Sequence, residues 1–328
     1  MRRRDFITLV GGGAVAWPLV ARAQQAAMPV IGFLHSGSPE PNARRLAGFR
    51  KGLSDAGLVE GKNVAIEFRW AQGKDERLPE LAADLIRQRV AVIATLSSTA
   101  AAVAAKAATS AIPIYFLVAD PPVELGLVSS LNRPGGNLTG VTGLNVELAP
   151  KKLELLHELL PTAASFALLV NPTNAIAADN QSSAVQAAAH ALGVRLHILH
   201  ARIEGDFESV FANLSQLRCD ALVIGSDLFY TSHSEQLAGL TVRHAVPSIY
   251  QFREFAAAGG LMGYGGSSSD WGYQGGIHTG RILAGVKPAD LPVQQATKVE
   301  LFINLKTARA LGLTFPLTLL GRADEVIE

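Results

Sequence analysis

Polar side chains that could bind a small molecule follow the strands predicted from the sequence, at the point where each strand ends. These side chains are Ser36, Ser97, Ser98, Thr99, Asp120, Asn171 and Asp227. The carboxyl ends of parallel strands meet at one edge of a sheet, and open α/β sheets bind their ligands there. Hydroxyls and the free N–H groups of the following helices bind a carboxylate, whereas an aspartate binds an ammonium group. The set therefore predicts a site for a small zwitterion.

Each of these residues also has a structural role open to it, because Ser, Thr, Asn and Asp are the preferred helix N-caps. Asp120 fits a capping role least well, since Pro121 and Pro122 follow it and force the chain out of a buried strand. Asn171 stands before Pro172, and an Asn-Pro pair also starts ordinary turns. Both roles stay open at these positions.

Aromatic residues gather in one later part of the sequence, at Tyr250, Phe252, Tyr264 and Trp271. They could stack on an apolar or aromatic ligand, and we count Tyr250 among the ligand-binding residues. Core packing is the alternative role for at least two of the four.

Motifs for catalysis and for cofactor binding are missing from the sequence. The eight histidines are scattered, Cys219 is the only cysteine, and neither a His-Glu-x-x-His nor a Gly-x-Ser-x-Gly motif occurs. Phosphate-binding and dinucleotide-binding glycine motifs are also absent. We expect a binding protein and no enzyme, with no metal and no cofactor.

Strands and helices alternate along the chain and position these residues. Apolar runs predict strands at 30–34, 64–70, 90–96 and 114–118, with helices between them. The pattern restarts after residue 141, with strands at 166–170, 195–201, 221–225 and 248–250. Such alternation predicts two α/β lobes, each built on a doubly wound parallel sheet.

The predicted lobes are each made from two pieces of the chain. The first contains residues 28–141 and about 251–290, and the second contains 142–250 and about 291–328. This division puts Leu261–Tyr264 in the first lobe and Gln294-Gln295 in the second. The chain then crosses between the lobes three times, which implies a hinge and a cleft.

Residues 1–23 resemble a bacterial twin-arginine export signal. Arg3-Arg4 precede an uncharged segment from Ile7 to Ala21, and Ala21-Arg22-Ala23 resembles a cleavage site. A short membrane anchor is the alternative, but the apolar stretch is shorter than the roughly 18 residues that a spanning helix needs. No cysteine follows for a lipid anchor, so we expect a cleaved, soluble periplasmic protein without membrane insertion.

The net charge gives no reason to expect a nucleic-acid partner. The whole chain carries +1, and removal of four arginines and one aspartate with residues 1–23 leaves about −2. A cytoplasmic repressor of similar fold would need a DNA-binding segment where this chain has its export signal.

Three stretches resemble a known family. They are PVIGFLHSGSP at 29–39, IPIYFLVADPPVELGLVSSLNRPGGNLTGVT at 112–142 and INLKTARALGLTFPLTLLGRADEVIE at 303–328. Together they are similar to bacterial ABC-transporter substrate-binding proteins related to the tryptophan/tyrosine-type binding proteins.

The resemblance implies a type I periplasmic-binding-protein fold, whose two lobes close on a ligand and then dock on permease subunits in the inner membrane. It also implies that the ligand is an amino acid or related carboxylate. The residues at the strand ends would contact this ligand, namely Ser36, Ser97, Ser98, Thr99, Asp120, Asn171 and Asp227. A periplasmic sensor that presents its ligand to a signalling receptor is the alternative function, and a periplasmic enzyme is a third.

Overall fold

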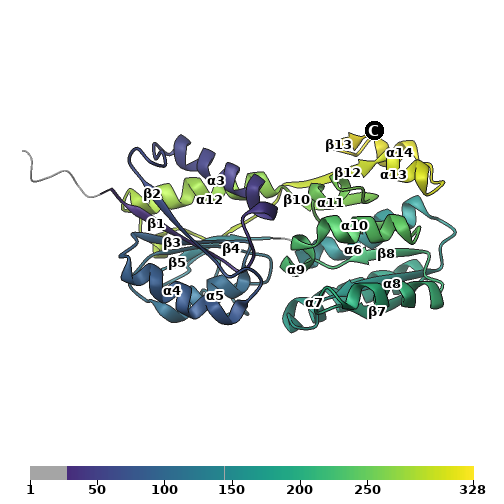
Figure 1. Cartoon of the computed structure of the whole chain (residues 1–328), viewed down its shortest axis with the longest axis horizontal. Coiled ribbons are helices and arrows are strands. Elements are labelled where there is room, and N and C mark those ends of the chain that lie inside the picture. Colours follow the sequence, from purple (N-terminus) through teal and green to yellow (C-terminus); the bar gives the residue numbers. More distant parts are fainter. Residues whose placement is uncertain (1–27, 144) are drawn as a thin grey trace, which may run out of the picture.

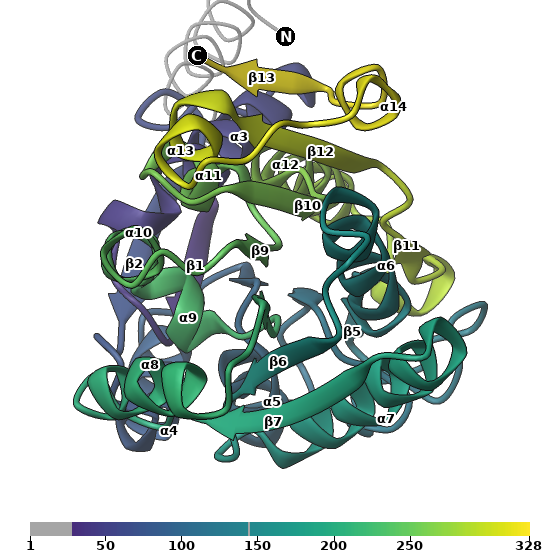
Figure 2. The same cartoon turned by 90° about the vertical axis from the view of Figure 1, so that its right-hand side faces the viewer.

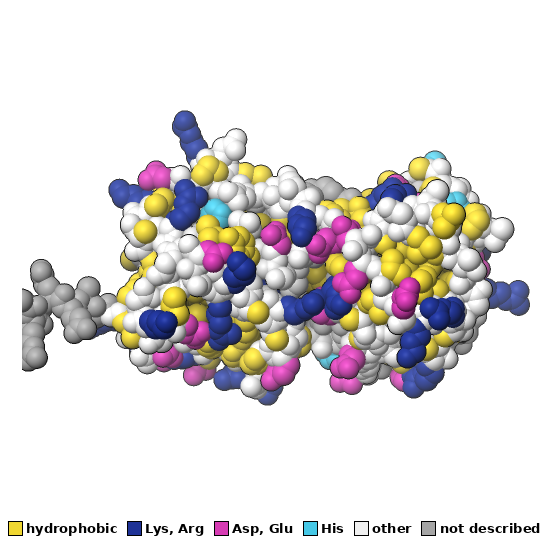
Figure 3. Space-filling view, turned by 90° about the horizontal axis from the view of Figure 1, so that it is seen from above, with side chains coloured by type: hydrophobic (Ala, Val, Ile, Leu, Met, Phe, Trp, Pro, Cys, Tyr) yellow, Lys and Arg dark blue, Asp and Glu magenta, His cyan; other side chains and the backbone are white. Residues whose placement is uncertain are grey.

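The computed structural model describes residues 28–143 and 145–328, which form two α/β lobes side by side (Figure 1). The predicted export signal at residues 1–23 lies outside the described residues. None of the described helices is both long and apolar enough to cross a bilayer. The face of the molecule seen in Figure 3 carries acidic and basic side chains interspersed over both lobes.

The first lobe contains a six-stranded sheet whose strand pairs are all parallel. Its order is β11-β5-β4-β3-β1-β2. The strands are β1 (Val30–His35), β2 (Ala65–Trp70), β3 (Val92–Leu96), β4 (Ile114–Val118), β5 (Leu138–Thr142) and β11 (Gln294–Gln295). Every residue of β3 and β4 is buried, as expected for central parallel strands covered on both faces.

Helices cover both faces of this first sheet. They are α3 (Ala43–Asp55), α4 (Leu78–Arg87), α5 (Thr99–Ala108) and α12 (Ser268–Leu283), with short 3-10 turns η1 (Glu40–Asn42), η2 (Asp75–Arg77) and η3 (Pro288–Asp290). Figure 1 shows α3 and α12 packed together above the sheet, and α4 and α5 below it.

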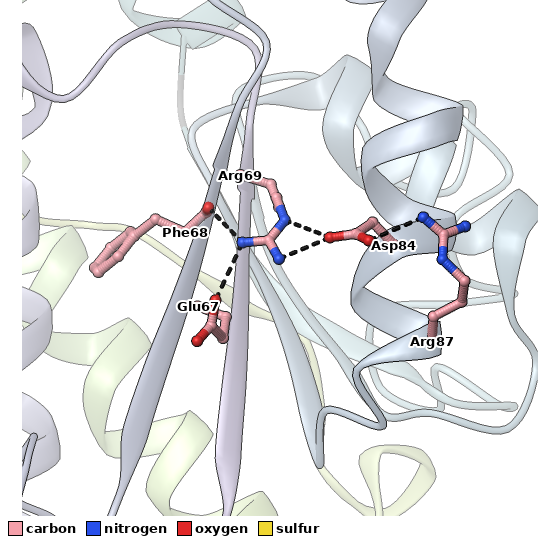
Figure 4. Close-up of polar contacts among 5 residues, drawn as sticks. All are labelled: Glu67, Phe68, Arg69, Asp84 and Arg87. Atoms are coloured by element: carbon pink, nitrogen blue, oxygen red, sulfur yellow. Dashed lines mark hydrogen bonds and ion pairs between the residues drawn. The ribbon is translucent and has the colours of Figure 1, made fainter.

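An ion-pair network ties the edge strand β2 to α4 (Figure 4). The Arg69 guanidinium lies 2.7 Å from Asp84 and 3.2 Å from Glu67, and Arg87 also pairs with Asp84 at 2.9 Å. The hydrogen bond from Arg69 lowers the pKa of the Asp84 carboxyl. Charged side chains on an edge strand also discourage pairing with another chain.

The second lobe contains a seven-stranded sheet with the order β13-β12-β10-β9-β8-β6-β7. The strands are β6 (Ser165–Val170), β7 (Arg195–His200), β8 (Ala221–Ile224), β9 (Ser248–Tyr250), β10 (Met262–Gly266), β12 (Val299–Asn304) and β13 (Glu325–Ile327). Its helices are α6 (Asn145–Leu159), α7 (Ala175–Leu192), α8 (Asp206–Gln216), α9 (Leu228–Ser232), α10 (Ser234–Arg243), α11 (Arg253–Ala257), α13 (Leu305–Ala310) and α14 (Leu317–Leu320). Figure 2 shows β13 and β7 at opposite edges.

The predicted architecture of two α/β lobes joined by three crossings is confirmed. The chain leaves the first lobe after β5, returns to it between β10 and α12, and leaves again between β11 and β12. The second sheet is not wholly parallel, because β10 and β12 run antiparallel, with Met262 opposite Ile303.

Two strands lie in the lobe opposite to the predicted one. The strand predicted at Leu261–Tyr264 is β10, and it pairs with β9 and β12 of the second sheet. Only the short helix α11 separates it from β9, so the chain stays in that lobe until Gly266. Gln294-Gln295 form β11 and pair with Val141 and Thr142 of the first sheet. This strand has two exposed residues and no apolar pattern, so the sequence gives no sign of its partner.

Close helix packing in the first lobe depends on four glycines. An added Cβ on Gly48, Gly52, Gly272 or Gly276 would lie only 2.0–2.2 Å from a carbonyl oxygen of the facing helix. Helices α3 and α12 therefore touch through their backbones. Gly272 faces the carbonyl of Arg45, so this contact fixes Arg45 and the neighbouring Trp271 relative to each other.

Candidate ligand-binding site

A cavity of about 900 Å³ lies between the two lobes, and residues from both lobes line it. Six of the eight predicted ligand-binding residues are among those lining it: Ser36, Ser97, Thr99, Asp120, Asn171 and Asp227. They come together because β1, β3, β4, β6 and β8 all end at the interface between the lobes. The predicted placement at the carboxyl ends of the strands is therefore correct for these six.

The other two predicted residues lie behind the cavity wall. The Ser98 hydroxyl oxygen accepts a hydrogen bond from the Ala101 N–H at 3.3 Å, which caps α5, and it lies 2.7 Å from the Ser36 hydroxyl. Tyr250 is fully buried, and its hydroxyl donates to the Asp227 carbonyl at 2.9 Å. Both side chains hold cavity-lining residues in place.

Asp120 presents a buried carboxylate to the cavity from the first lobe. It is 5% exposed, and the Thr99 hydroxyl donates to its Oδ2 at 2.9 Å. Burial raises the pKa of the Asp120 carboxyl, and the negative charge of Asp227 adds to this effect, whereas the bond from Thr99 opposes it. The ionised form of Asp120 is thus disfavoured until a cation lies near it.

Asp227 presents a second carboxylate from the second lobe. It accepts hydrogen bonds from the side-chain amides of Asn171 at 3.1 Å and Asn174 at 3.2 Å. It also caps α9 by accepting from the Phe229 N–H at 2.9 Å. Burial raises the pKa of the Asp227 carboxyl, and these three donors oppose the shift. Asn171 therefore orients Asp227 as well as lining the cavity.

Ser97 has the most unusual backbone at the cavity wall. Its φ is 58°, which is the left-handed region, and such a conformation costs a non-glycine residue about 1–3 kcal/mol. The buried Ser97 hydroxyl has no hydrogen-bond partner among the residues that the structure describes. A strained residue with an unused hydroxyl at the end of β3 is a suitable contact for a ligand.

Arg45 lines the cavity and was not found from the sequence. It lies on α3 and is only 2% exposed, and its Nη1 donates to the Asn42 side chain. Its Nε has no partner, and no carboxylate of the described residues lies within 4.0 Å of its guanidinium. Burial lowers the pKa of Arg45 to about 10, so the side chain remains charged at neutral pH.

A sign of this role does exist in the sequence. Arg45 precedes Phe49 and Gly52 by four and seven positions, so it lies on the buried stripe of α3. Arg44 and Arg45 are adjacent at the start of the helix, and two adjacent arginines are typical of an exposed surface. The sequence therefore did not indicate clearly that Arg45 is buried.

Aromatic rings form part of the cavity wall. Phe229, Phe252 and Trp271 line it, and the rings of Phe252 and Trp271 meet edge to face with centroids 5.7 Å apart. The Trp271 indole N–H is buried and has no partner in the described part of the chain. Two of the four aromatic residues noted in the sequence therefore reach the cavity, whereas Tyr250 and Tyr264 do not line it.

The cavity lining thus includes the buried guanidinium of Arg45, the carboxylates of Asp120 and Asp227, several hydroxyls and three aromatic rings, and the charged residues Glu40, Asp75 and Arg202 also line it. Arg45, Asp120 and Asp227 have no ion-pair partner within 4.0 Å among the described residues, whereas Arg202 lies 3.7 Å from Asp206. Such an arrangement suits a molecule that carries both a cationic and an anionic group, with an apolar portion against the rings.

Comparisons with known proteins agree with this geometry. The family model described as ABC transporter substrate binding protein matches residues 39–327. A tyrosine-binding protein from Clostridioides difficile is 29% identical over 269 residues, which are 81% of this chain and 76% of that protein.

Solved structures share the fold of the whole molecule. A conserved domain protein from Vibrio cholerae superposes with a TM-score of 0.84 at 26% identity, covering 91% of this chain and 99% of that one. A domain from Streptococcus pneumoniae in complex with L-Trp has the same TM-score at 24% identity, covering 92% and 100%. The expected two-lobed type I fold is therefore confirmed.

Proposed function

Because the chain belongs to the family of ABC transporter substrate-binding proteins, we propose that it captures an amino acid or related carboxylate between its lobes for an ABC importer. In this proposal residues 1–23 direct export to the periplasm. The loaded protein then delivers its ligand to permease subunits in the inner membrane. ATP hydrolysis belongs to other subunits, so the chain itself needs no catalytic group.

The observation that carries the proposal is the presence of uncompensated charges of both signs in one cavity. Asp120 and Asp227 reach it from opposite lobes and suit an ammonium group, while Arg45 suits a carboxylate. The ring pair of Phe252 and Trp271 supplies an apolar surface beside them. The tyrosine-binding relative supports an amino acid as the ligand class.

Ligand capture follows from the position of the cavity. A ligand that contacts both lobes binds the closed molecule better than the open one and shifts the population toward closure. The three crossings between the lobes supply a hinge for this motion. Closure then forms the surface that the permease recognises.

A thermal-shift screen of the purified protein against the twenty amino acids, their aromatic derivatives and small carboxylates tests this function. A ligand at 100 times its Kd stabilises the folded state by about 2.7 kcal/mol, which raises the Tm by several degrees. We expect Asp120→Ala to abolish the shift while the ligand-free protein stays folded. The matched control is Asp179→Ala, which removes an exposed carboxylate on α7. A screen in which no amino acid or carboxylate raises the Tm would contradict the proposal.

A further inference from the structure

A lysine is buried without a counter-ion behind the second-lobe wall of the cavity. Lys152 lies on α6, is 1% exposed, and donates from its Nζ to the Ser226 hydroxyl oxygen at 2.9 Å. No carboxylate of the described residues lies within 4.0 Å of this amine. The same helix contributes Ala149, Leu153 and Leu156 to the apolar core, so Lys152 is embedded in an apolar layer.

Ser226 itself lines the cavity, although it is only 4% exposed. Its backbone is held by Gln181 of α7, whose side-chain carbonyl accepts from the Ser226 N–H at 2.6 Å and whose amide donates to the Ser226 carbonyl at 3.1 Å. Gly225 packs beneath it, since an added Cβ would lie 2.6 Å from the Leu169 carbonyl. The serine therefore has a fixed position at the end of β8.

The hydrogen bonds determine which role the Ser226 hydroxyl has left. In its charged form Lys152 has donors only, so the serine oxygen is then the acceptor in their contact. The hydroxyl proton is then free to donate, and no acceptor for it is found in the described part of the chain. Because Ser226 lines the cavity, a ligand in the cavity could accept a hydrogen bond from this hydroxyl.

We propose that Ser226 donates this proton to a carboxylate oxygen of the ligand, and that Lys152 is the positioning residue that orients the serine and attracts the anion. The inference rests on the proposed function, since it takes the ligand to be an amino acid or related carboxylate. It adds a second-lobe donor to the first-lobe guanidinium of Arg45. A carboxylate that contacts both lobes would favour closure.

The protonation of Lys152 provides a way to measure whether the ligand carboxylate lies close to Ser226. Burial lowers its pKa to about 7, and a carboxylate close to Ser226 would raise that pKa again. The elements packed on α6 are α7, β8, β9, β10 and α14, and their titratable residues are Asp179, His190, Tyr250 and Tyr264. None of these four makes a hydrogen bond or ion pair with Lys152. Ligand binding near pH 8 should therefore be accompanied by proton uptake at Lys152.

Titration calorimetry of the purified protein with L-tryptophan, L-tyrosine and any other amino acid that raises the Tm, and with the corresponding amides, in which a neutral carboxamide replaces the carboxylate, tests the proposal. We expect Ser226→Ala and Lys152→Met each to weaken binding of the amino acid about 10-fold, as expected for loss of a hydrogen bond to a charged group. Lys152→Met should weaken binding of the carboxamide less than binding of the amino acid, because the carboxamide carries no negative charge for the ammonium to attract and loses only the orientation of Ser226. The matched control is Lys151→Met, since that neighbour is exposed and pairs with Glu154.

Proton uptake gives a second measurement that loss of structure would not mimic. Binding enthalpies at pH 8 in buffers of different ionisation enthalpy should show uptake for the unmodified protein and less for Lys152→Met. The Tm of ligand-free Lys152→Met should be no lower than that of the unmodified protein, because the change removes an unpaired buried charge. If the unmodified protein binds no amino acid or carboxylate of the thermal-shift screen, the proposed function fails. If it binds and both variants bind equally well without a change in proton uptake, only this inference is overturned.

Discussion

Three buried charged side chains at the cavity or behind its wall have no opposite charge within ion-pair distance among the residues that the structure describes. Arg45, Asp120 and Lys152 are buried, and no ion-pair partner of any of them lies within 4.0 Å in the described part of the chain. Buried, unpaired charges reduce the free energy of unfolding, so the folded protein carries a cost at these positions. A ligand of complementary charge offsets that cost, which makes these residues sensitive reporters of binding.

Substitution of Arg45 should separate binding from stability. Arg45→Met keeps much of the side-chain volume and removes the guanidinium, so we expect binding of an amino-acid ligand to weaken about 10- to 100-fold. Calorimetry measures the Kd, and a thermal melt checks that the ligand-free protein remains folded.

Arg44→Met is the matched control for this prediction. Arg44 is the adjacent residue, its side chain is 53% exposed, and its one ion pair is a 3.9 Å contact with Glu254. Exposed pairs of this kind contribute at most about 1 kcal/mol, so the Kd should stay within about 2-fold. Equal losses in the two variants would show that Arg45 has no direct contact with the ligand.

Helices α3 and α12 carry residues of the site, and their glycine contact sets where those residues lie. Arg45 belongs to α3 and Trp271 to α12, and an added Cβ on Gly272 would lie 2.0 Å from the Arg45 carbonyl. Any side chain at position 272 would force the two helices apart. Because the site residues move with their helices, the packing defect should reach the cavity.

Gly272→Ala should therefore lower both stability and affinity. Overpacking of a closed core contact typically costs about 1–3 kcal/mol of unfolding free energy, and the short distance here favours the upper end. Denaturant unfolding measures that loss, and calorimetry measures the change in Kd.

The control is Gly239→Ala in α10. An added Cβ there meets nothing within 4 Å, so the helix propensity of alanine should raise the free energy of unfolding by up to about 1 kcal/mol. A Gly272→Ala protein as stable as the unmodified one would show that α3 and α12 can separate at little cost.

Elements with strong apolar patterns were predicted well from the sequence, and those defined by long-range pairing were not. The central strands β3 and β4 are continuous apolar runs because both of their faces are buried. Strand β11 has two exposed residues, and its place beside β5 depends on a backbone pairing that leaves no pattern in the side chains. Strand β10 has the sequence MGYGG, whose glycines do not reveal which sheet it joins.

The site, like the fold, was predicted from the sequence where local patterns determine it and was missed where long-range packing determines it. Residues just after the strand ends, such as Asp120, could be predicted to line the cavity, because parallel strands bring their carboxyl ends to one edge of the sheet. Arg45 and Trp271 reach the cavity from helices, and Lys152 lies on a helix behind its wall, where it contacts Ser226. Their roles depend on how the helices pack, which the residue types alone do not specify.

The proposed ligand capture would be a property of the whole molecule, because residues of both lobes line the cavity. Asp120 and Asp227 lie on different lobes, which are joined by the three crossings between β5 and α6, between β10 and α12, and between β11 and β12. A ligand changes the balance between open and closed forms only as far as it binds the closed form better. Removing one lobe's contact should therefore weaken closure even when the ligand still occupies the other lobe.

Small-angle X-ray scattering should reveal this dependence. Saturation with L-tryptophan or L-tyrosine, whichever gives the larger thermal shift, should lower the radius of gyration of the unmodified protein.

Taking a population from 1% to 99% closed requires about 5.5 kcal/mol of differential binding. The hydrogen bonds that Asp227 can offer an ammonium group are worth about 1.5–3 kcal/mol. At saturating ligand, Asp227→Asn should then leave about one tenth of the molecules open at the lower end of that range and about six tenths at the upper end, so the radius of gyration should fall less. Asp179→Asn on α7 should contract fully, since that side chain is exposed on a helix outside the cavity lining. Full contraction of Asp227→Asn would show that the first lobe alone drives closure, and no contraction of the unmodified protein would show that the ligand binds without closing the cleft.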